Sequence, residues 1–260
     1  MLDIFDKLNE WLPGFILIFS RISAMTITLP IIGYSMVNTR IRIIFALVIT
    51  IILFPMIGSV HPDIGSVLEM MIFICREIMI GLIIGFGGKL IFEAFSMAGS
   101  FVGRQMGLAM ANVMDPTSEQ QMPILSQFWL LVMIMFFLVT NGHYLFIEII
   151  FKNFNLIPLG GAEFSPETGI TIIRGGAMAF EIALRFAAPA MVFLLLVDVA
   201  IALTARVMPQ MNIFLVTLPL KIGAGLFVMI FSLDIFQILF DPVYDDLAEI
   251  IGTLVTNMGA

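Results

Sequence analysis

The stretch PILSQFWLLVMIMFFLVTNGHYLFI, residues 123–147, decides the fold class of this chain. It carries no Asp, Glu, Lys or Arg, and we take His143 as the only side chain polar enough to matter in lipid. A helix needs about 20 predominantly apolar residues to cross the hydrocarbon core of a bilayer. The stretch therefore predicts a transmembrane helix.

The composition of the whole chain agrees with a membrane protein. Of its 260 residues, 60% are hydrophobic and 12% are charged, and the mean hydropathy is +1.10. Ordinary globular proteins are about 25% charged. The net charge of -7, thinly spread, excludes nucleic-acid binding, which requires clustered Lys and Arg. Cys75 is the one cysteine, so the chain forms no internal disulfide, and we expect this side chain to fill core space.

Apolar regions follow one another along the chain, and we predict an all-α membrane protein with about six hydrophobic helical regions. They cover residues 12–33, 41–58, 67–101, 123–150, 177–205 and 212–240. In or near alternate gaps, basic residues stand out: Arg40 and Arg42, then Arg104, then Arg206 and Lys221, while the other gaps and both ends are acidic or balanced. By the positive-inside rule, this pattern predicts six spans with both termini outside the cytoplasm.

Charged residues interrupt most of these regions. A charge at the centre of a bilayer costs about 2.5–3.5 kcal/mol on insertion scales, so such residues must pair or face protein. The candidates for buried charge pairing are Arg21, Arg76, Glu77, Lys89, Glu93, Glu181, Arg185, Asp198 and Asp234. Glu181 with Arg185, and Lys89 with Glu93, have the i,i+4 spacing that lets side chains meet on one helix. The others need partners elsewhere in the fold or on other chains.

Glycines recur at four-residue spacing in two places. They are Gly81 and Gly85, then Gly99, Gly103 and Gly107. Rows of small residues let helix backbones approach closely in membranes. The rows fit tight packing within the chain and, in the sharper interpretation, a helix surface for packing against neighbouring subunits.

Methionines recur beside the second glycine row. On a helix, Met106, Met110 and Met114 would lie on one face, and they lead into the sequence MDPTSEQQMP. Pro116 disfavours helix at Asp115, and the polar run that follows is typical of a loop. Filling of the core is the simpler interpretation. Flexible thioethers beside an irregular polar loop also fit a deformable seal.

Three classes of function remain to be compared. An intramembrane enzyme is disfavoured because the chain has no HExxH, GxSxG, P-loop or Gly-rich dinucleotide motif, and we predict no catalytic residue, metal ligand or cofactor. A secondary transporter could use the carboxylates of Glu77, Glu93, Glu181 and Asp198 as ion sites. The inverted repeats expected there are not evident. The third class, a channel subunit for protein export, is what the family resemblance described next implies, and it would account for the packing rows, the charges and the methionine-rich loop together.

Four stretches carry a family resemblance, and they occur in the family's order over about residues 12–240. They are FSRISAMTITLPIIGYSMVNTRIRIIFALVITIILFP, GRQMGLAMANVMDPTSEQQMPILSQF, NGHYLFIEIIFKNFNLIPLG and RVMPQMNIFLVTLPLKIGAGL. They resemble the FliR family of flagellar type III export-gate proteins, which is related to the SctT subunit of virulence injectisomes. The segment RVMPQMNIFLVTLPLKI is the most specific.

The resemblance implies a non-enzymatic core subunit of the export gate of the bacterial flagellum, or the equivalent injectisome subunit. It implies a FliP-like part, residues 1–175, and a FliQ-like helical hairpin with an acidic C-terminal tail, residues 176–260. Such a subunit assembles helically with FliP-like and FliQ-like membrane subunits, beside a FlhB-like switch protein. Its place is the bacterial inner membrane at the flagellar basal body, where unfolded flagellar polypeptides pass through the channel.

The resemblance also assigns roles to individual residues. The plug of the family maps to about residues 106–122, and we predict that this loop helps to close the pore. The plug and seal residues would be Met106, Met110, Met114, Asp115, Pro116 and Met122. Arg206, Pro209 and Gln210 would form the turn of the helical hairpin, where Pro209 breaks the helix.

Overall fold

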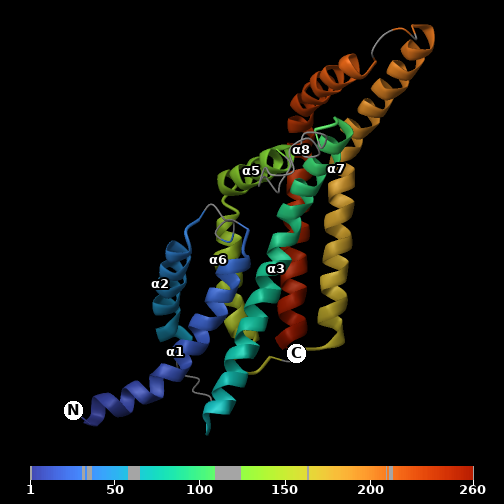
Figure 1. Ribbon diagram of the computed structural model, residues 1–260. Helices are drawn as coiled ribbons and strands as arrows, with labels where there is room; N and C mark the ends of the chain where they lie inside the picture. Colours follow the sequence, from blue (N-terminus) through green and yellow to red (C-terminus); the bar gives the residue numbers. More distant parts are fainter. Residues whose placement is uncertain are drawn as a thin grey trace. The chain divides into compact units, whose positions relative to one another are not determined.

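The computed structural model describes residues 2–30, 33, 37–57, 65–108, 124–162, 164–208, 210 and 213–259. Its helices are α1 (Leu2–Thr28), α2 (Thr39–Ile57), α3 (Val67–Gln105), α5 (Ile124–Val139), α6 (His143–Leu156), α7 (Pro166–Val207) and α8 (Ile213–Gly259) (Figure 1). None of the described residues lies in a strand. Every apolar region predicted from the sequence contributes a helix, so the all-α prediction is confirmed.

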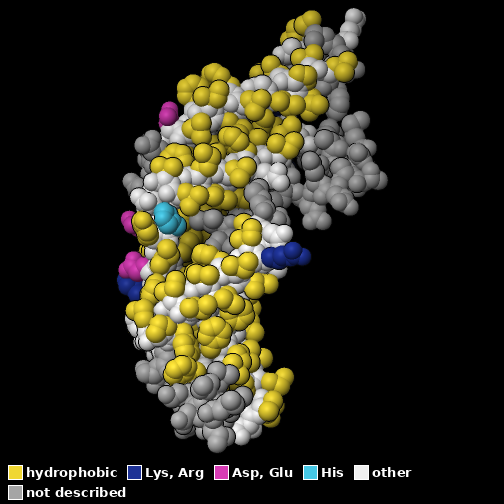
Figure 2. Space-filling view, turned by 90° about the vertical axis from the view of Figure 1, so that its left-hand side faces the viewer, with side chains coloured by type: hydrophobic (Ala, Val, Ile, Leu, Met, Phe, Trp, Pro, Cys, Tyr) yellow, Lys and Arg dark blue, Asp and Glu magenta, His cyan; other side chains and the backbone are white. Residues whose placement is uncertain are grey.

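Several helices are long and apolar enough to cross a membrane. Among the described residues they are Trp11–Thr28, Thr39–Ile57, Pro166–Val207 and Leu215–Asp234, and α5 with α6 adds a fifth if that bent pair is one span. At most 44% of each of the four is buried within the chain. Hydrophobic side chains cover most of the described surface in Figure 2, with few charges between them. The chain is an all-α membrane protein with four or five candidate spans, where the sequence indicated about six.

The stretch that decides the fold class forms two helices instead of one. α5 ends at Val139 and α6 begins at His143, and the pair is bent by 74°. Between them, Asn141 has a φ of 61°, in the left-handed region that Asn adopts more readily than most residues. The sequence predicted one helix through this stretch, and the turn at Asn141 and Gly142 divides that helix into two, a preference that hydropathy does not register.

The chain divides into two compact units, each assembled from separate segments. Unit 1 comprises Met1–Leu90, Leu138–Gly176 and Asp246–Ala260, and unit 2 comprises Ile91–Phe137 and Ala177–Asp245. Helices α3, α7 and α8 therefore contribute to both units. The predicted division at residue 175 concerns likeness to FliP and FliQ, and it stays a prediction.

In unit 1, α1 and α2 lie side by side (Figure 1). The rings of Trp11 and Phe15 on α1 make T-shaped contacts with Phe54 on α2, at centroid distances of 6.4 and 5.7 Å. The last turns of α8 reach α3, where Gly87 leaves room for the side chain of Leu254. These contacts pack α2 against α1 and the end of α8 against α3.

The core of unit 2 is an aromatic cluster to which four helices each contribute at least one ring. Phe95 of α3, Trp129 of α5, Phe186 of α7 and Phe236 of α8 are all buried. Ring centroids lie 4.6 Å apart for Trp129 and Phe186, and 4.9 Å apart for Phe95 and Phe236. Such pairs add about 0.5–1.5 kcal/mol each beyond the burial of their area.

Candidate functional site

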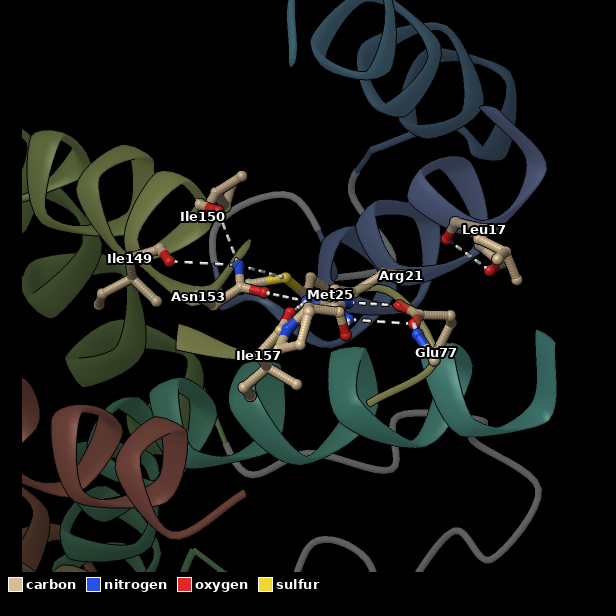
Figure 3. A network of polar contacts seen from close by, with 11 residues as sticks. Leu17, Arg21, Met25, Glu77, Ile149, Ile150, Asn153 and Ile157 are labelled. Atoms are coloured by element: carbon tan, nitrogen blue, oxygen red, sulfur yellow. Dashed lines mark hydrogen bonds and ion pairs between the residues drawn. The ribbon is translucent and has the colours of Figure 1, made fainter. Parts of the chain in front are cut away.

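A buried ion pair lies at the centre of unit 1. Arg21 of α1 and Glu77 of α3 point toward one another, and neither side chain is exposed (Figure 3). Nε of Arg21 donates to Oε2 of Glu77, and Nη2 donates to Oε1 at 3.0 Å. This two-pronged geometry matches the planar guanidinium to the carboxylate, which makes it a strong form of charge-assisted hydrogen bond.

The remaining polar atoms of the pair are also satisfied. Nη1 of Arg21 donates to Oδ1 of Asn153 at 3.0 Å and to the carbonyl oxygen of Ile157 at 2.9 Å. The backbone N–H of Gly160 donates to Oε1 of Glu77 at 2.8 Å. A buried charge pair is tolerated only when such additional hydrogen bonds compensate its lost hydration. The network therefore ties α1, α3, α6 and the segment after α6 into one body.

Sequence reasoning missed Asn153 as a member of this network. Its side chain is buried on α6, and its Nδ2 atom donates to the carbonyl oxygen of Ile150 at 2.7 Å. The available signal was an amide within the apolar stretch NGHYLFIEIIFKNFNLIPLG. An isolated amide does not reveal its partner, because that partner comes from a distant helix.

Gly81 and Gly85 let α1 approach α3 at the ion pair. A Cβ atom on Gly81 would overlap the backbone carbonyl oxygen of Arg21, and one on Gly85 would overlap the side chain of Thr28. The close approach of the two backbones is what allows Arg21 to reach Glu77. These two glycines therefore contact a helix of their own chain, which is the first of the two interpretations of the row.

In the second glycine row, Gly99 and Gly103 pack against α5, whereas Gly107 has a different role. A Cβ on Gly99 would overlap the backbone of Leu125 on α5, and Gly103 faces the side chain of Leu125. Gly107 does not continue the row, because it lies beyond the end of α3 with a φ of +83°. Its conformation is one that residues with a Cβ rarely adopt.

The end of α3 has the hydrogen bonds of a Schellman motif. The N–H of Gly107 donates to the carbonyl oxygen of Arg104 at 3.0 Å, and the N–H of Leu108 donates to that of Gly103 at 3.1 Å. A glycine in the left-handed conformation is the common terminator of this kind. Helix α3 ends at Gln105, so Met106 lies just beyond it; because Met110 and Met114 are outside the described residues, their common face with Met106 stays a prediction.

Met106 is buried in unit 2. Its side chain is 0% exposed and lies against Gly225 of α8, where a Cβ atom would overlap it. The other predicted plug and seal residues are outside the described residues: Met110, Met114, Asp115, Pro116 and Met122. The structure thus fixes where the predicted loop leaves α3.

A polar cluster lies next to the end of α3 in unit 2. Nζ of Lys221 on α8 forms an ion pair with Oδ1 of Asp198 on α7 at 2.5 Å. Nε2 of Gln105, the last residue of α3, donates to Oδ2 of the same carboxylate at 3.3 Å. Asp198 therefore joins α7 to α8 and to the end of α3. Sequence analysis singled out Asp198 as a charge that needs a partner, but it named neither Lys221 nor Gln105 as that partner.

The other predicted charges have varied surroundings. Glu181 and Arg185 form the expected i,i+4 ion pair on α7, and both side chains are exposed. Asp234 is exposed on α8, and Lys89 and Glu93 are half-buried on α3. Arg76 is exposed on α3.

The predicted hairpin turn lies between α7 and α8. Arg206 is exposed in the last turn of α7, which ends at Val207, and α8 begins at Ile213. Gln210 is exposed in the turn, and Pro209 is outside the described residues.

Two further observations concern metal binding and the cysteine. Within the described ranges, no group of three or more His, Cys, Asp or Glu residues could hold a metal ion. Cys75 is exposed on α3, so the expectation that it fills core space was wrong for the chain alone. It lines a shallow apolar hollow with Met71, Met79 and Phe164.

Comparison with known proteins places these features in a family. The model of the family described as bacterial export proteins, family 1, matches residues 12–247. The chain is 33% identical over 257 residues to the flagellar biosynthetic protein FliR of Bacillus subtilis (strain 168), which covers 98% of this chain and 99% of that protein. It is 30% identical over 256 residues to the protein of that name from Pectobacterium carotovorum subsp. carotovorum, covering 97% of each. It is 28% identical over 253 residues to the flagellar biosynthetic protein FliR of Escherichia coli (strain K12), which covers 95% of this chain and 97% of that protein.

Proposed function

This chain belongs to the bacterial export proteins, family 1, and on that premise we propose that it is a membrane subunit of the flagellar export apparatus. The observation that carries the proposal is the match along almost the whole chain to proteins named for flagellar biosynthesis. Its four or five candidate spans suit a place in the membrane. The relatives compared above are flagellar, which favours a flagellar system over an injectisome.

The finer proposal is a non-enzymatic core subunit of the type III export gate in the inner membrane. In it, this chain forms part of the channel for unfolded flagellar polypeptides, together with FliP-like, FliQ-like and FlhB-like proteins. Its exposed apolar helices support this role, because so much apolar surface requires lipid or partner protein around it. The buried ion pair of Arg21 and Glu77, by contrast, has its hydrogen-bond partners within the chain.

The arrangement of the carboxylates disfavours a secondary transporter. A transported ion needs carboxylates that can release their partner and admit an ion. Glu77 is enclosed in its network with Arg21, and Glu181 and Asp198 each pair with a cation of the same unit. These pairs fit structural roles better than ion sites.

We also propose that the loop after α3 helps to close the pore. Met110, Met114 and Met122 would supply soft side chains that exclude water and ions yet move aside for a polypeptide. Met106, which is buried against Gly225, would anchor the beginning of the loop. Asp115 and Pro116 would keep the loop irregular.

Export itself is tested by deleting the gene in the strain that makes this chain. We expect the deletion strain to lack secreted flagellin and flagella, and the plasmid-borne gene to restore both. Normal flagellar secretion by the deletion strain would contradict the proposal.

The seal is tested by replacing Met110 and Met114 together with Ser and recording ion leak in a gate-open background. We expect the leak to increase, while the control Met56→Ser, on the exposed face of α2, leaves it unchanged. Equal leak in the double variant and the wild type would rule out a sealing role for these two methionines.

A further inference from the structure

The two residues that follow α3 are held against one face of α8. Met106 is 0% exposed and lies against Gly225, where a Cβ atom would overlap its side chain. A Cβ atom on Gly107 would lie 3.0 Å from Cδ1 of Leu218. Leu218, Lys221 and Gly225 are three and four residues apart, so they lie on the same face of α8. This face therefore receives the chain at the point where it leaves α3.

Gln105, the last residue of α3, reaches the same face of α8 through a carboxylate of α7. Its Nε2 atom donates to Oδ2 of Asp198 at 3.3 Å, and Oδ1 of that carboxylate pairs with Nζ of Lys221 at 2.5 Å. The side chain of Lys221 is only 17% exposed, so loss of the carboxylate would leave its charge poorly hydrated. We call this set the exit clamp: Gln105, Met106 and Gly107 with Asp198, Leu218, Lys221 and Gly225.

The exit clamp contains more than the termination of a helix requires. The N–H groups of Gly107 and Leu108 already satisfy the last carbonyl oxygens of α3, as in other helices that end at a glycine. The polar link from Gln105 to α7 and α8 is additional. A contiguous set of contacts of this kind transmits the position of one element to another. The link therefore couples the start of the loop after α3 to the two helices that follow it in the chain.

We propose that Gln105, Asp198 and Lys221 are positioning residues for the loop that helps to close the pore. They keep the end of α3 seated on α7 and α8, so that the loop starts from a fixed place. Release of the clamp lets the start of the loop move, and the seal leaks. The inference rests on the proposed role of this loop, and it adds the residues that hold the loop in position.

Trypsin measures the clamp directly, because Arg104 is exposed and immediately precedes Gln105. The sequence has no Lys or Arg between Arg104 and Lys152, so the loop itself offers no tryptic site. Trypsin cleaves extended chain, and the bond after Arg104 is therefore cut when the end of α3 unwinds. The rate is measured for the full chain in mild detergent, relative to cleavage after Arg174, which is exposed on α7 in unit 1.

Asp198→Ala should raise this relative rate at least about fivefold, because the fraction of molecules with an unwound end of α3 increases. The matched control is Glu181→Ala, which removes another carboxylate of α7 whose ion pair, with Arg185, is exposed. We expect the control to leave the relative rate unchanged. The same relative rate in Asp198→Ala and the wild type would overturn the inference.

Gln105→Leu separates positioning from stability, because it leaves the ion pair of Asp198 and Lys221 in place. It is also informative if Asp198→Ala does not fold. In a gate-open background we expect at least about twofold more ion leak than in the wild type. The matched control is Gln127→Leu, which replaces an exposed glutamine of α5 and should leave the leak unchanged.

Combination with the methionine variant shows whether the clamp acts through the loop. When Gln105→Leu is added to Met110→Ser and Met114→Ser, the leak should not exceed that of the methionine double variant, because residues of one device are not additive. A further increase in leak on adding Gln105→Leu would show that Gln105 acts elsewhere, and it would overturn the inference.

Two other outcomes separate the inference from the proposed function. If the methionine double variant leaks and Gln105→Leu does not, the loop closes the pore without the clamp and the inference alone is overturned. If neither leaks while Asp198→Ala is cleaved faster after Arg104, the clamp holds α3 but has no seal to position. The proposed role of the loop then fails, and the inference fails with it.

Discussion

Two ion pairs in this chain have the same chemistry and opposite surroundings. Arg21 and Glu77 are 56 residues apart in sequence, come from two helices and are completely buried. Glu181 and Arg185 are four residues apart on one helix, with side chains 59% and 70% exposed. The first pair needs the whole of unit 1 to exist, whereas the second needs only one turn of α7. Burial, and not charge, decides which pair the fold depends on.

The largest effect is expected from breaking the buried pair on one side. Arg21→Met leaves the carboxylate of Glu77 buried without its cation, which typically costs about 3–5 kcal/mol. We expect a large drop in the midpoint of thermal unfolding in detergent. The double variant Arg21→Met with Glu77→Met should recover a good part of the loss, and no recovery would show that packing matters more than charge.

The second-largest loss of stability is expected from disturbing the close approach of α1 and α3, which lets Arg21 reach Glu77. Gly81→Ala places a Cβ atom where the backbone carbonyl oxygen of Arg21 lies, so α1 must move away from α3. Overpacking of this kind costs about 1–3 kcal/mol. Gly176→Ala is the matched control, because nothing lies within 4 Å of its Cβ position and Ala favours helix. The two variants are compared by thermal unfolding, and similar midpoints would contradict the described packing.

The ion pair between Asp198 and Lys221 is intermediate in exposure, so we expect an intermediate loss of stability when it is removed. Their side chains are 36% and 17% exposed, and Gln105 also donates to the carboxylate. Asp198→Asn removes the ion pair but keeps the size of the side chain, and we expect a loss of about 1–2 kcal/mol. A loss as large as that of Arg21→Met would contradict the ranking by burial.

The smallest effect belongs to the exposed pair. Arg185→Ala should change the stability of the chain in detergent by less than about 1 kcal/mol, since ion pairs outside the packed core contribute little to folding. Raising the salt concentration should diminish the difference from the wild type further. A loss above 2 kcal/mol in detergent would show that this pair is not merely a surface contact.

The same comparison explains which parts of the site could be predicted. The i,i+4 spacing of Glu181 and Arg185 is local, so the sequence alone was sufficient to propose that pair. Arg21 and Glu77 could be identified only as charges that require partners. Their pairing depends on the approach of α1 at Gly81, and no spacing rule connects residues on different helices.

The fold, like the site, could be predicted from the sequence only in part. Hydropathy predicted the helical regions well, because it averages over many residues. It failed where a single backbone conformation decides the outcome. Asn141 interrupts the most apolar stretch, and Gly107 ends α3 before the expected row of methionines is complete. In the sequence, Gly107 had a plausible alternative role as a member of the glycine row, and its positive φ shows that it ends the helix instead.

The central claim is that this chain is a subunit of a larger export assembly. The most direct test is native mass spectrometry of the tagged chain, purified in mild detergent after co-expression with the products of its neighbouring genes. The account predicts a complex that holds one copy of this chain with several small, strongly hydrophobic partners. A stable monomer or homodimer without partners would contradict it and return attention to the intramembrane carboxylates.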